Sequence, residues 1–146
     1  MKPVSKSQFN LSLQCEKAFW LYRHDKGLMK HSASQKKIMQ RGTDFGLLMQ
    51  GLFPGGVDVS TAEENFGNRI SLTSDLIEKG TDPIYEATLT AKVEETPLLC
   101  MIDILVPGNN GWHIYEVKSS TSVKETYIAD AGFQQFVAEQ MGLHIL

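Results

Sequence analysis

Cysteine and long apolar runs are both scarce in this chain of 146 residues. The two cysteines, Cys15 and Cys100, are far apart and too few to complete a four-cysteine zinc or iron–sulfur site. No apolar run approaches the roughly 18 residues that a membrane span needs. The polar start, residues 1–6, has no apolar segment behind it and so does not resemble a signal peptide. We therefore expect a cytoplasmic protein without a disulfide and without a membrane partner.

Several catalytic signatures are also missing. The four histidines have no serine or cysteine partner in a recognisable motif, which argues against covalent nucleophilic catalysis. The turn sequence Pro54-Gly55-Gly56 lacks the Gly-Lys-Ser/Thr ending of a phosphate-binding loop. What remains is an ordinary globular composition, 42% hydrophobic and 21% charged, at a length typical of a single domain.

Charge is divided unevenly along the chain, although the net charge is only −3. Residues 1–50 hold nine Lys/Arg and three Asp/Glu, whereas residues 51–146 hold five Lys/Arg and fourteen Asp/Glu. A protein with one basic region that binds phosphates and one acidic region that binds cations would show this charge distribution. The alternative is that Lys30, Lys36, Lys37 and Arg41 merely solvate helix faces.

Apolar periodicity and capping signals predict an α/β protein. Ser5 or Ser7 is a candidate cap for the first helix, and the sequence Thr61-Ala62-Glu63-Glu64 is a candidate capping box for the third. We expect residues 1–60 to form a mostly helical, basic region of the single domain 1–146, and residues 61–146 to form its candidate catalytic core of a helix, three strands and a final helix. After the last helix, residues 142–146 indicate the start of a further strand, so we expect the domain to continue beyond them.

The predicted helices are about 5–22, 34–51, 61–78 and 124–141, and the predicted strands are 84–91, 98–106 and 112–119.

The most informative residues are Asp103 and the triplet Glu116-Val117-Lys118, because they interrupt two apolar stretches, 98–106 and 111–118. Charges in such stretches are costly to bury unless they are paired or bound to a metal. Two carboxylates and a lysine on one sheet face suit metal-assisted phosphodiester cleavage, with Mg²⁺ or Mn²⁺ on the carboxylates and the lysine steering or deprotonating a water. The alternative is a surface ion pair of little energetic value.

Residues 107–111, Pro-Gly-Asn-Asn-Gly, predict a hairpin between these stretches. A turn centred on Asn110-Gly111 places Asp103 opposite Lys118, and a turn centred on Asn109-Asn110 places it opposite Glu116. Either register puts the three charged side chains on one face. A three-residue loop would move Asp103 to the other face.

Taken together, these residues resemble the PD-(D/E)xK nuclease superfamily, in its RecB-like exonuclease branch. Within that branch the chain resembles the N-terminal nuclease domain of a bacterial family of unknown function, over essentially its whole length. The segments that carry the resemblance are Ser5-Lys6-Ser7-Gln8-Phe9, Cys15-Glu16-Lys17-Ala18-Phe19-Trp20-Leu21-Tyr22, Leu52-Phe53-Pro54-Gly55-Gly56-Val57, Ile84-Tyr85-Glu86-Ala87-Thr88, Asp103-Ile104-Leu105-Val106 and Tyr115-Glu116-Val117-Lys118-Ser119-Ser120-Thr121.

The resemblance implies a restriction-endonuclease-like fold, a central mixed sheet flanked by helices. By that pattern Asp103 and Glu116 are metal ligands, helped by the backbone carbonyl of Val117. Lys118 would orient the attacking water and offset charge in the transition state. Glu86 is either a third ligand, a group that supports the ligands, or a partly buried strand residue paired with a neighbour.

The chain departs from the family pattern in three places. Gln134 is a weak match to a Gln-x-x-x-Tyr motif whose tyrosine is absent here, so Gln134 either joins the site or is simply exposed. Gly42 is followed four positions later by Gly46 instead of a metal-binding histidine. Cys15 stands where some relatives have the first ligand of an iron–sulfur cluster. We expect it to be a free buried cysteine, with a cluster only in a longer parent protein.

The resemblance and the residues together predict a metal-dependent nuclease that hydrolyses DNA phosphodiester bonds, of exonuclease or DNA-processing type. A second hypothesis is a catalytically weak nucleic-acid-binding or scaffold domain that retains the fold. A third is an unrelated α/β binding domain with a chance triplet, which predicts no affinity for divalent ions. The sequence does not distinguish DNA from RNA or one oligomeric state from another.

Overall fold

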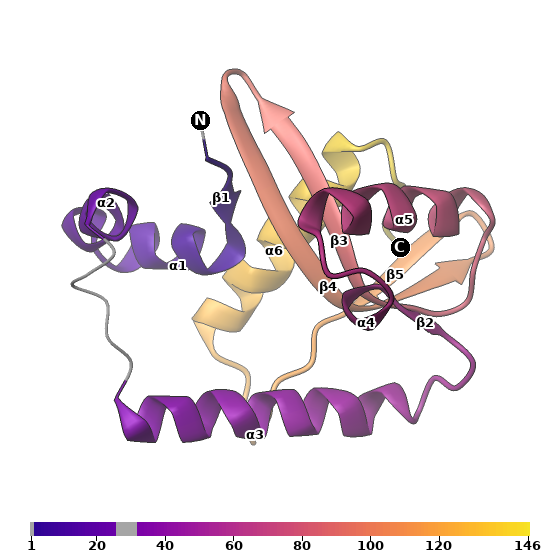
Figure 1. Ribbon diagram of the computed structural model, residues 1–146, viewed down its shortest axis with the longest axis horizontal. Helices are drawn as coiled ribbons and strands as arrows, with labels where there is room; N and C mark the ends of the chain where they lie inside the picture. Colours follow the sequence, from indigo (N-terminus) through magenta and orange to yellow (C-terminus); the bar gives the residue numbers. More distant parts are fainter. Residues whose placement is uncertain (1, 26–31) are drawn as a thin grey trace.

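The computed structural model describes residues 2–25 and 32–146, and it confirms the predicted α/β class. A mixed sheet of five strands is flanked by helices (Figure 1). Within the described residues, no helix is long and apolar enough to cross a membrane. The elements are, in order, β1 (Val4–Ser5), α1 (Lys6–Gln14), α2 (Glu16–His24), α3 (Ala33–Gln50), β2 (Val57–Asp58), α4 (Val59–Ala62), α5 (Phe66–Glu78), β3 (Ile84–Val93), β4 (Thr96–Gly108), β5 (Gly111–Tyr115) and α6 (Glu125–Gln140).

The predicted first helix is two helices. Ser5 caps α1 in a capping box with Gln8, as the serine signal indicated. The helix then breaks at Cys15, whose backbone is extended with φ −164° and ψ 110°. Cys15 is exposed between α1 and α2, so the expectation of a buried cysteine was wrong. Cys100 is the buried one, and burial raises the pKa of its thiol to about 12.

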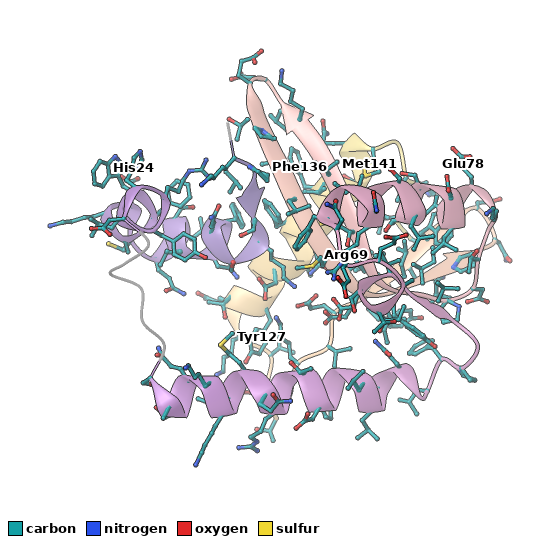
Figure 2. The ribbon with its side chains drawn as sticks, viewed as in Figure 1. His24, Arg69, Glu78, Tyr127, Phe136 and Met141 are labelled. Carbon is teal, nitrogen blue, oxygen red and sulfur yellow. The ribbon has the colours of Figure 1, made fainter. Side chains whose placement is uncertain are left out.

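The predicted third helix was also placed wrongly at its start. Asp58 caps the one-turn helix α4 by accepting from the backbone N–H groups of Ser60 and Thr61, and Asn65 caps α5. Between the two helices the chain bends at Glu64 and Asn65. Arg69 (Figure 2) stabilises the connection between α4 and α5, because its guanidinium donates to the carbonyls of Ser60 and Glu63 at 3.0 and 2.7 Å.

Strand β4 organises the sheet, whose order is β1-β4-β3-β2 with β5 also paired to β4. One edge of β4 carries β3 in an antiparallel hairpin. The other edge carries β1 near the start of β4, with Ser5 beside Leu99, and β5 near its end, with Tyr115 beside Ile104. Because β1 is parallel to β4 and β5 is antiparallel, these two strands run toward each other along that edge.

The β4–β5 hairpin adopts one of the two predicted registers. Gly108 pairs with Gly111, so Asn109 and Asn110 form the turn. The predicted third strand was too long, because β5 ends at Tyr115 and the residues 116–118 follow it without regular strand pairing. Ile145 makes an isolated parallel bridge with Trp112, in agreement with the strand-like pattern of residues 142–146.

The core lies between the sheet and the helices α4, α5 and α6. Helix α3 has no buried residue, and it lies along the side of the molecule away from the tip of the β3–β4 hairpin (Figure 1). Four of its apolar side chains are more than half exposed. The buried core cluster is formed by Val59, Leu76, Ile84, Ala87, Leu89, Leu98, Cys100, Ile102, Leu105, Phe133, Val137 and Ala138.

Candidate functional site

Glu116 is the centre of a partly buried polar cluster at the edge of β4. Its side chain is 9% exposed, and its oxygen Oε1 accepts from the ammonium groups of both Lys6 and Lys118, each at 2.7 Å. Its other oxygen, Oε2, accepts from Nε2 of Gln134 at 2.6 Å. Burial opposes ionisation, but Lys6, Lys118 and Gln134 outweigh it and hold the pKa of Glu116 below its ordinary value.

Lys118 is shared between two carboxylates. Its Nζ lies 2.6 Å from Oδ2 of Asp130, in addition to the contact with Glu116, and the ring of Tyr127 lies 5.4 Å away. Asn10 donates to the other oxygen of Asp130. Burial favours the neutral amine, yet the hydrogen bonds to Asp130 and Glu116 prevail and raise the Lys118 pKa, so this side chain is a cation at neutral pH.

Asp103 joins the cluster through the backbone. Its Oδ2 accepts from the N–H of Val117 at 2.7 Å, which ties the segment after β5 to the middle of β4. Burial first, and then the charge of Glu116, raise the pKa of Asp103 above its ordinary value. The expected role of the Val117 carbonyl as a metal ligand stays a prediction.

Glu86 lies on β3 between the two residues that pair with Ile104 and Ile102, and therefore opposite Asp103. Its φ is 52°, a left-handed backbone that residues with a Cβ adopt rarely and at a cost of about 1–3 kcal/mol. Burial raises the Glu86 pKa to about 7, with further contributions from Asp103 and Asp58. Glu86 lines the same cavity as Asp103 and Glu116, and its role as a third ligand stays a prediction.

A cavity of about 750 Å³ opens onto these side chains. Its other wall is α3, which contributes two glycines one turn apart, Gly42 and Gly46. A Cβ placed at either glycine would meet no atom within 4 Å, so this wall leaves the space open. The polar and charged residues around the cavity are Lys6, Thr43, Gln50, Asp58, Ser60, Thr61, Glu86, Asp103, Glu116, Lys118, Ser119, Ser120, Lys124 and Tyr127.

Neither models of known protein families nor curated protein sequences match this chain. Sequence analysis identified Asp103, Glu116 and Lys118, and the structure brings them together. Gln134, for which two outcomes were open, is completely buried and contacts Glu116, whereas its neighbour Gln135 is exposed.

Sequence analysis missed four members of the cluster: Lys6, Asn10, Asp58 and Asp130. One signal was available for Asp130, since it precedes Gln134 by four residues and the two therefore share a face of α6. Nothing in the local sequence marks Lys6 or Asn10, because their partners are more than a hundred positions away.

The donor set suits a hard divalent cation, although within residues 2–25 and 32–146 no three Asp, Glu, His or Cys side chains are already arranged around one metal position. Among the described residues, five carboxylates, those of Asp58, Glu86, Asp103, Glu116 and Asp130, are accompanied by three ammonium groups, those of Lys6, Lys118 and Lys124. This excess of negative charge contributes to the raised pKa of Glu86. Carboxylate oxygens are the ligands that Mg²⁺ and Mn²⁺ prefer.

Proposed function

We propose that this chain is a metal-dependent nuclease that hydrolyses phosphodiester bonds of nucleic acid, with DNA as the favoured substrate and exonuclease or DNA processing as the favoured activity. The observation that carries the proposal is the convergence of Asp103, Glu116 and Lys118 on one open cavity. A domain that only binds has no evident need for a partly buried carboxylate cluster whose negative charge exceeds its positive charge.

Asp103 and Glu116 would hold Mg²⁺ or Mn²⁺, with Glu86 as a third ligand. Asp103 uses one carboxylate oxygen for the N–H of Val117, which leaves the other for a cation. Oε2 of Glu116 accepts one hydrogen bond, from Gln134, and keeps a second lone pair. A divalent cation bound there supplies Lewis-acid polarisation of the phosphoryl group.

The chain's own residues supply charge and orientation. Lys118 presents a positive charge whose position is fixed by Glu116 and Asp130, and which would oppose the negative charge that develops on the phosphate during hydrolysis. Gln134 fixes the orientation of the Glu116 carboxylate from the buried side. These contacts preorganise the site, which is a requirement for electrostatic stabilisation.

The position of the basic residues supports a polyanionic substrate. Lys6, Lys118 and Lys124 line the cavity, and Lys36, Lys37 and Arg41 are exposed elsewhere on α3, the helix that forms one of its walls. Cations beside an open cavity attract phosphates and fix the register of a nucleic acid without reading its bases.

The proposal is tested by incubating end-labelled single- and double-stranded DNA and RNA with the protein in Mn²⁺, Mg²⁺ or EDTA. We expect cleavage that requires the metal and falls to background in Asp103→Asn and Glu116→Gln. The matched control is Glu95→Gln, because Glu95 is 88% exposed and remote from the cavity. Cleavage that persists in EDTA, or that both site variants retain, would overturn the proposal.

A catalytically weak nucleic-acid-binding domain is the second candidate, favoured by one observation. Both oxygens of Glu116 already have protein donors, so a cation must compete for this carboxylate. This candidate predicts DNA binding without cleavage and without saturable Mn²⁺ binding in calorimetry. The nuclease predicts saturable Mn²⁺ binding that Asp103→Asn abolishes.

A further inference from the structure

We propose that Lys6 is a second cationic residue of this site, which neutralises Glu116 until a divalent cation binds and then contacts a phosphate of the nucleic acid. The inference rests on the proposed function and extends it, because it assigns a substrate contact to a residue outside the Asp103, Glu116 and Lys118 set. It starts from the 2.7 Å contact between Nζ of Lys6 and Oε1 of Glu116.

The N-terminal segment holds Lys6 in place by several independent contacts. Ser5 pairs with β4 and forms the capping box of α1, so the next residue begins the helix at the edge of the cavity. Arg23 holds the chain on both sides of Lys6, because it donates to the carbonyl of Lys2 at 2.8 Å and to Oε1 of Gln8 at 3.2 Å. The backbone of Lys6 is therefore fixed, whereas its four-carbon side chain can change direction.

Lys6 and Lys118 hold the same oxygen of Glu116, but they differ in what else they contact. Lys118 has a second carboxylate partner, Asp130, at 2.6 Å. In the part of the chain that the structure describes, Nζ of Lys6 has Glu116 as its only ion-pair partner. A cation that binds Glu116 competes with both ammonium groups, but Asp130 keeps Lys118 in place, whereas among the described residues Lys6 has no second carboxylate partner that would hold it.

A displaced Lys6 remains beside the cavity. Its side chain is 22% exposed and lines the same space as Glu86 and Asp103. Once a divalent cation neutralises these carboxylates, the strongest anion that enters the cavity is a substrate phosphate. Lysine binds phosphate as a flexible point charge, which suits a residue that exchanges one anion for another.

The reactivity of lysine amines in the wild-type protein tests this role of Lys6 without depending on how a variant folds. Acetylation by a small reagent is quantified at each lysine by mass spectrometry, first without metal, then with Mn²⁺, then with Mn²⁺ and a phosphorothioate oligonucleotide that resists hydrolysis. We expect Mn²⁺ to increase acetylation of Lys6 about fivefold, because its ion pair is released, and the oligonucleotide to reverse the increase. Lys92, which is 60% exposed and distant from the cavity, is the internal control.

A pair of variants gives a second readout. Lys6→Met should bind Mn²⁺ about fivefold more tightly in calorimetry, since a competing cation is gone, and should bind the oligonucleotide about tenfold more weakly. The control Lys92→Met should change neither value. Unchanged acetylation of Lys6 in Mn²⁺, or unchanged affinities in Lys6→Met, would show that Lys6 is a static structural partner and overturn the inference.

Failure of the inference and failure of the proposed function give different results. If Mn²⁺ binds and DNA is cleaved while the acetylation of Lys6 stays constant, the nuclease stands and the role of Lys6 is refuted. If Mn²⁺ does not bind to wild-type protein, the proposed function fails, and the role of Lys6 fails with it.

Discussion

Nζ of Lys6 and Oε1 of Glu116 lie 2.7 Å apart although 110 positions separate them in the chain. The sheet explains the contact. Strands β1 and β5 approach each other along one edge of β4, and these two residues directly follow their facing ends. The polar cluster therefore forms at a gap between two strands that share a neighbour.

The ion pair between Lys118 and Asp130 predicts a stability loss on neutralising the acid. Asp130→Asn leaves the ammonium of Lys118 with one carboxylate and removes a buried anion that Asn10 contacts. We expect the free energy of unfolding to fall by about 1–3 kcal/mol in urea denaturation. Glu139→Gln, on the exposed side of the same helix, should change it by less than about 0.5 kcal/mol. An equal loss in both variants would contradict the prediction.

Substitutions at Gln134 and Gln135 compare the stability cost of a buried carboxylate with that of an exposed one. Gln134→Glu places a carboxylate within hydrogen-bonding distance of Glu116 in a site with no exposure, whereas Gln135→Glu adds one on the exposed side of α6. We expect Gln134→Glu to lose about 3 kcal/mol of stability at pH 8 and to recover part of it at pH 5, where the two acids can share a proton. Gln135→Glu should be nearly neutral at both values, and a similar loss in the two variants would contradict this account.

The raised pKa of Glu86 predicts a pH-dependent stability in metal-free protein. Folding raises this pKa from 4.5 to about 7, so between these values the folded state binds more protons than the unfolded state, and stability falls as pH rises. Glu86→Gln removes the effect. After allowing for solvent screening, we expect the variant to be about 1–2 kcal/mol more stable than wild type at pH 8 in EDTA and equal to it near pH 4. Parallel pH profiles for the two proteins in thermal denaturation would contradict the prediction.

Alanine substitutions at two glycines should change the stability of the protein in opposite directions. A Cβ at Gly56 would lie 2.6 Å from Cζ of Tyr85 and 2.7 Å from the carbonyl of Pro83, so Gly56→Ala should destabilise the protein by about 1–3 kcal/mol. A Cβ at Gly132, inside α6, would meet no atom within 4 Å, so Gly132→Ala should stabilise it by about 0.5–1 kcal/mol. Melting temperatures of the two variants should therefore move in opposite directions from wild type.

Local patterns in the sequence predicted the long elements well. The helices α3 and α6 and the β3–β4–β5 meander follow from apolar periodicity and turn residues, and the two-residue turn at Asn109-Asn110 was one of two registers considered. Strands β1 and β2 were missed because two residues carry no periodicity, and each is defined by a partner far away in sequence. The third strand was predicted to be too long, because the backbone N–H of Val117 donates to the carboxylate of Asp103 and not to a carbonyl of a neighbouring strand.

The residues of the candidate site likewise differ in whether the local sequence marks them. Asp103, Glu116 and Lys118 were identifiable because charge within apolar segments is conspicuous, and Gln134 was identifiable only through a family resemblance. The importance of Lys6 is invisible locally, since lysine at the start of a helix usually lies in solvent. Its role depends on a sheet edge that no local pattern specifies.

The convergence of β1 and β5 on β4 has a consequence for biosynthesis. The cluster combines Lys6 with Gln134, so a growing chain has no complete site until α6 has left the ribosome and packed. A truncated product that ends before α6 would carry the basic N-terminal region without the contact of Asp130 with Lys118 and that of Gln134 with Glu116. The topology thus makes completion of the domain a precondition for assembling the site.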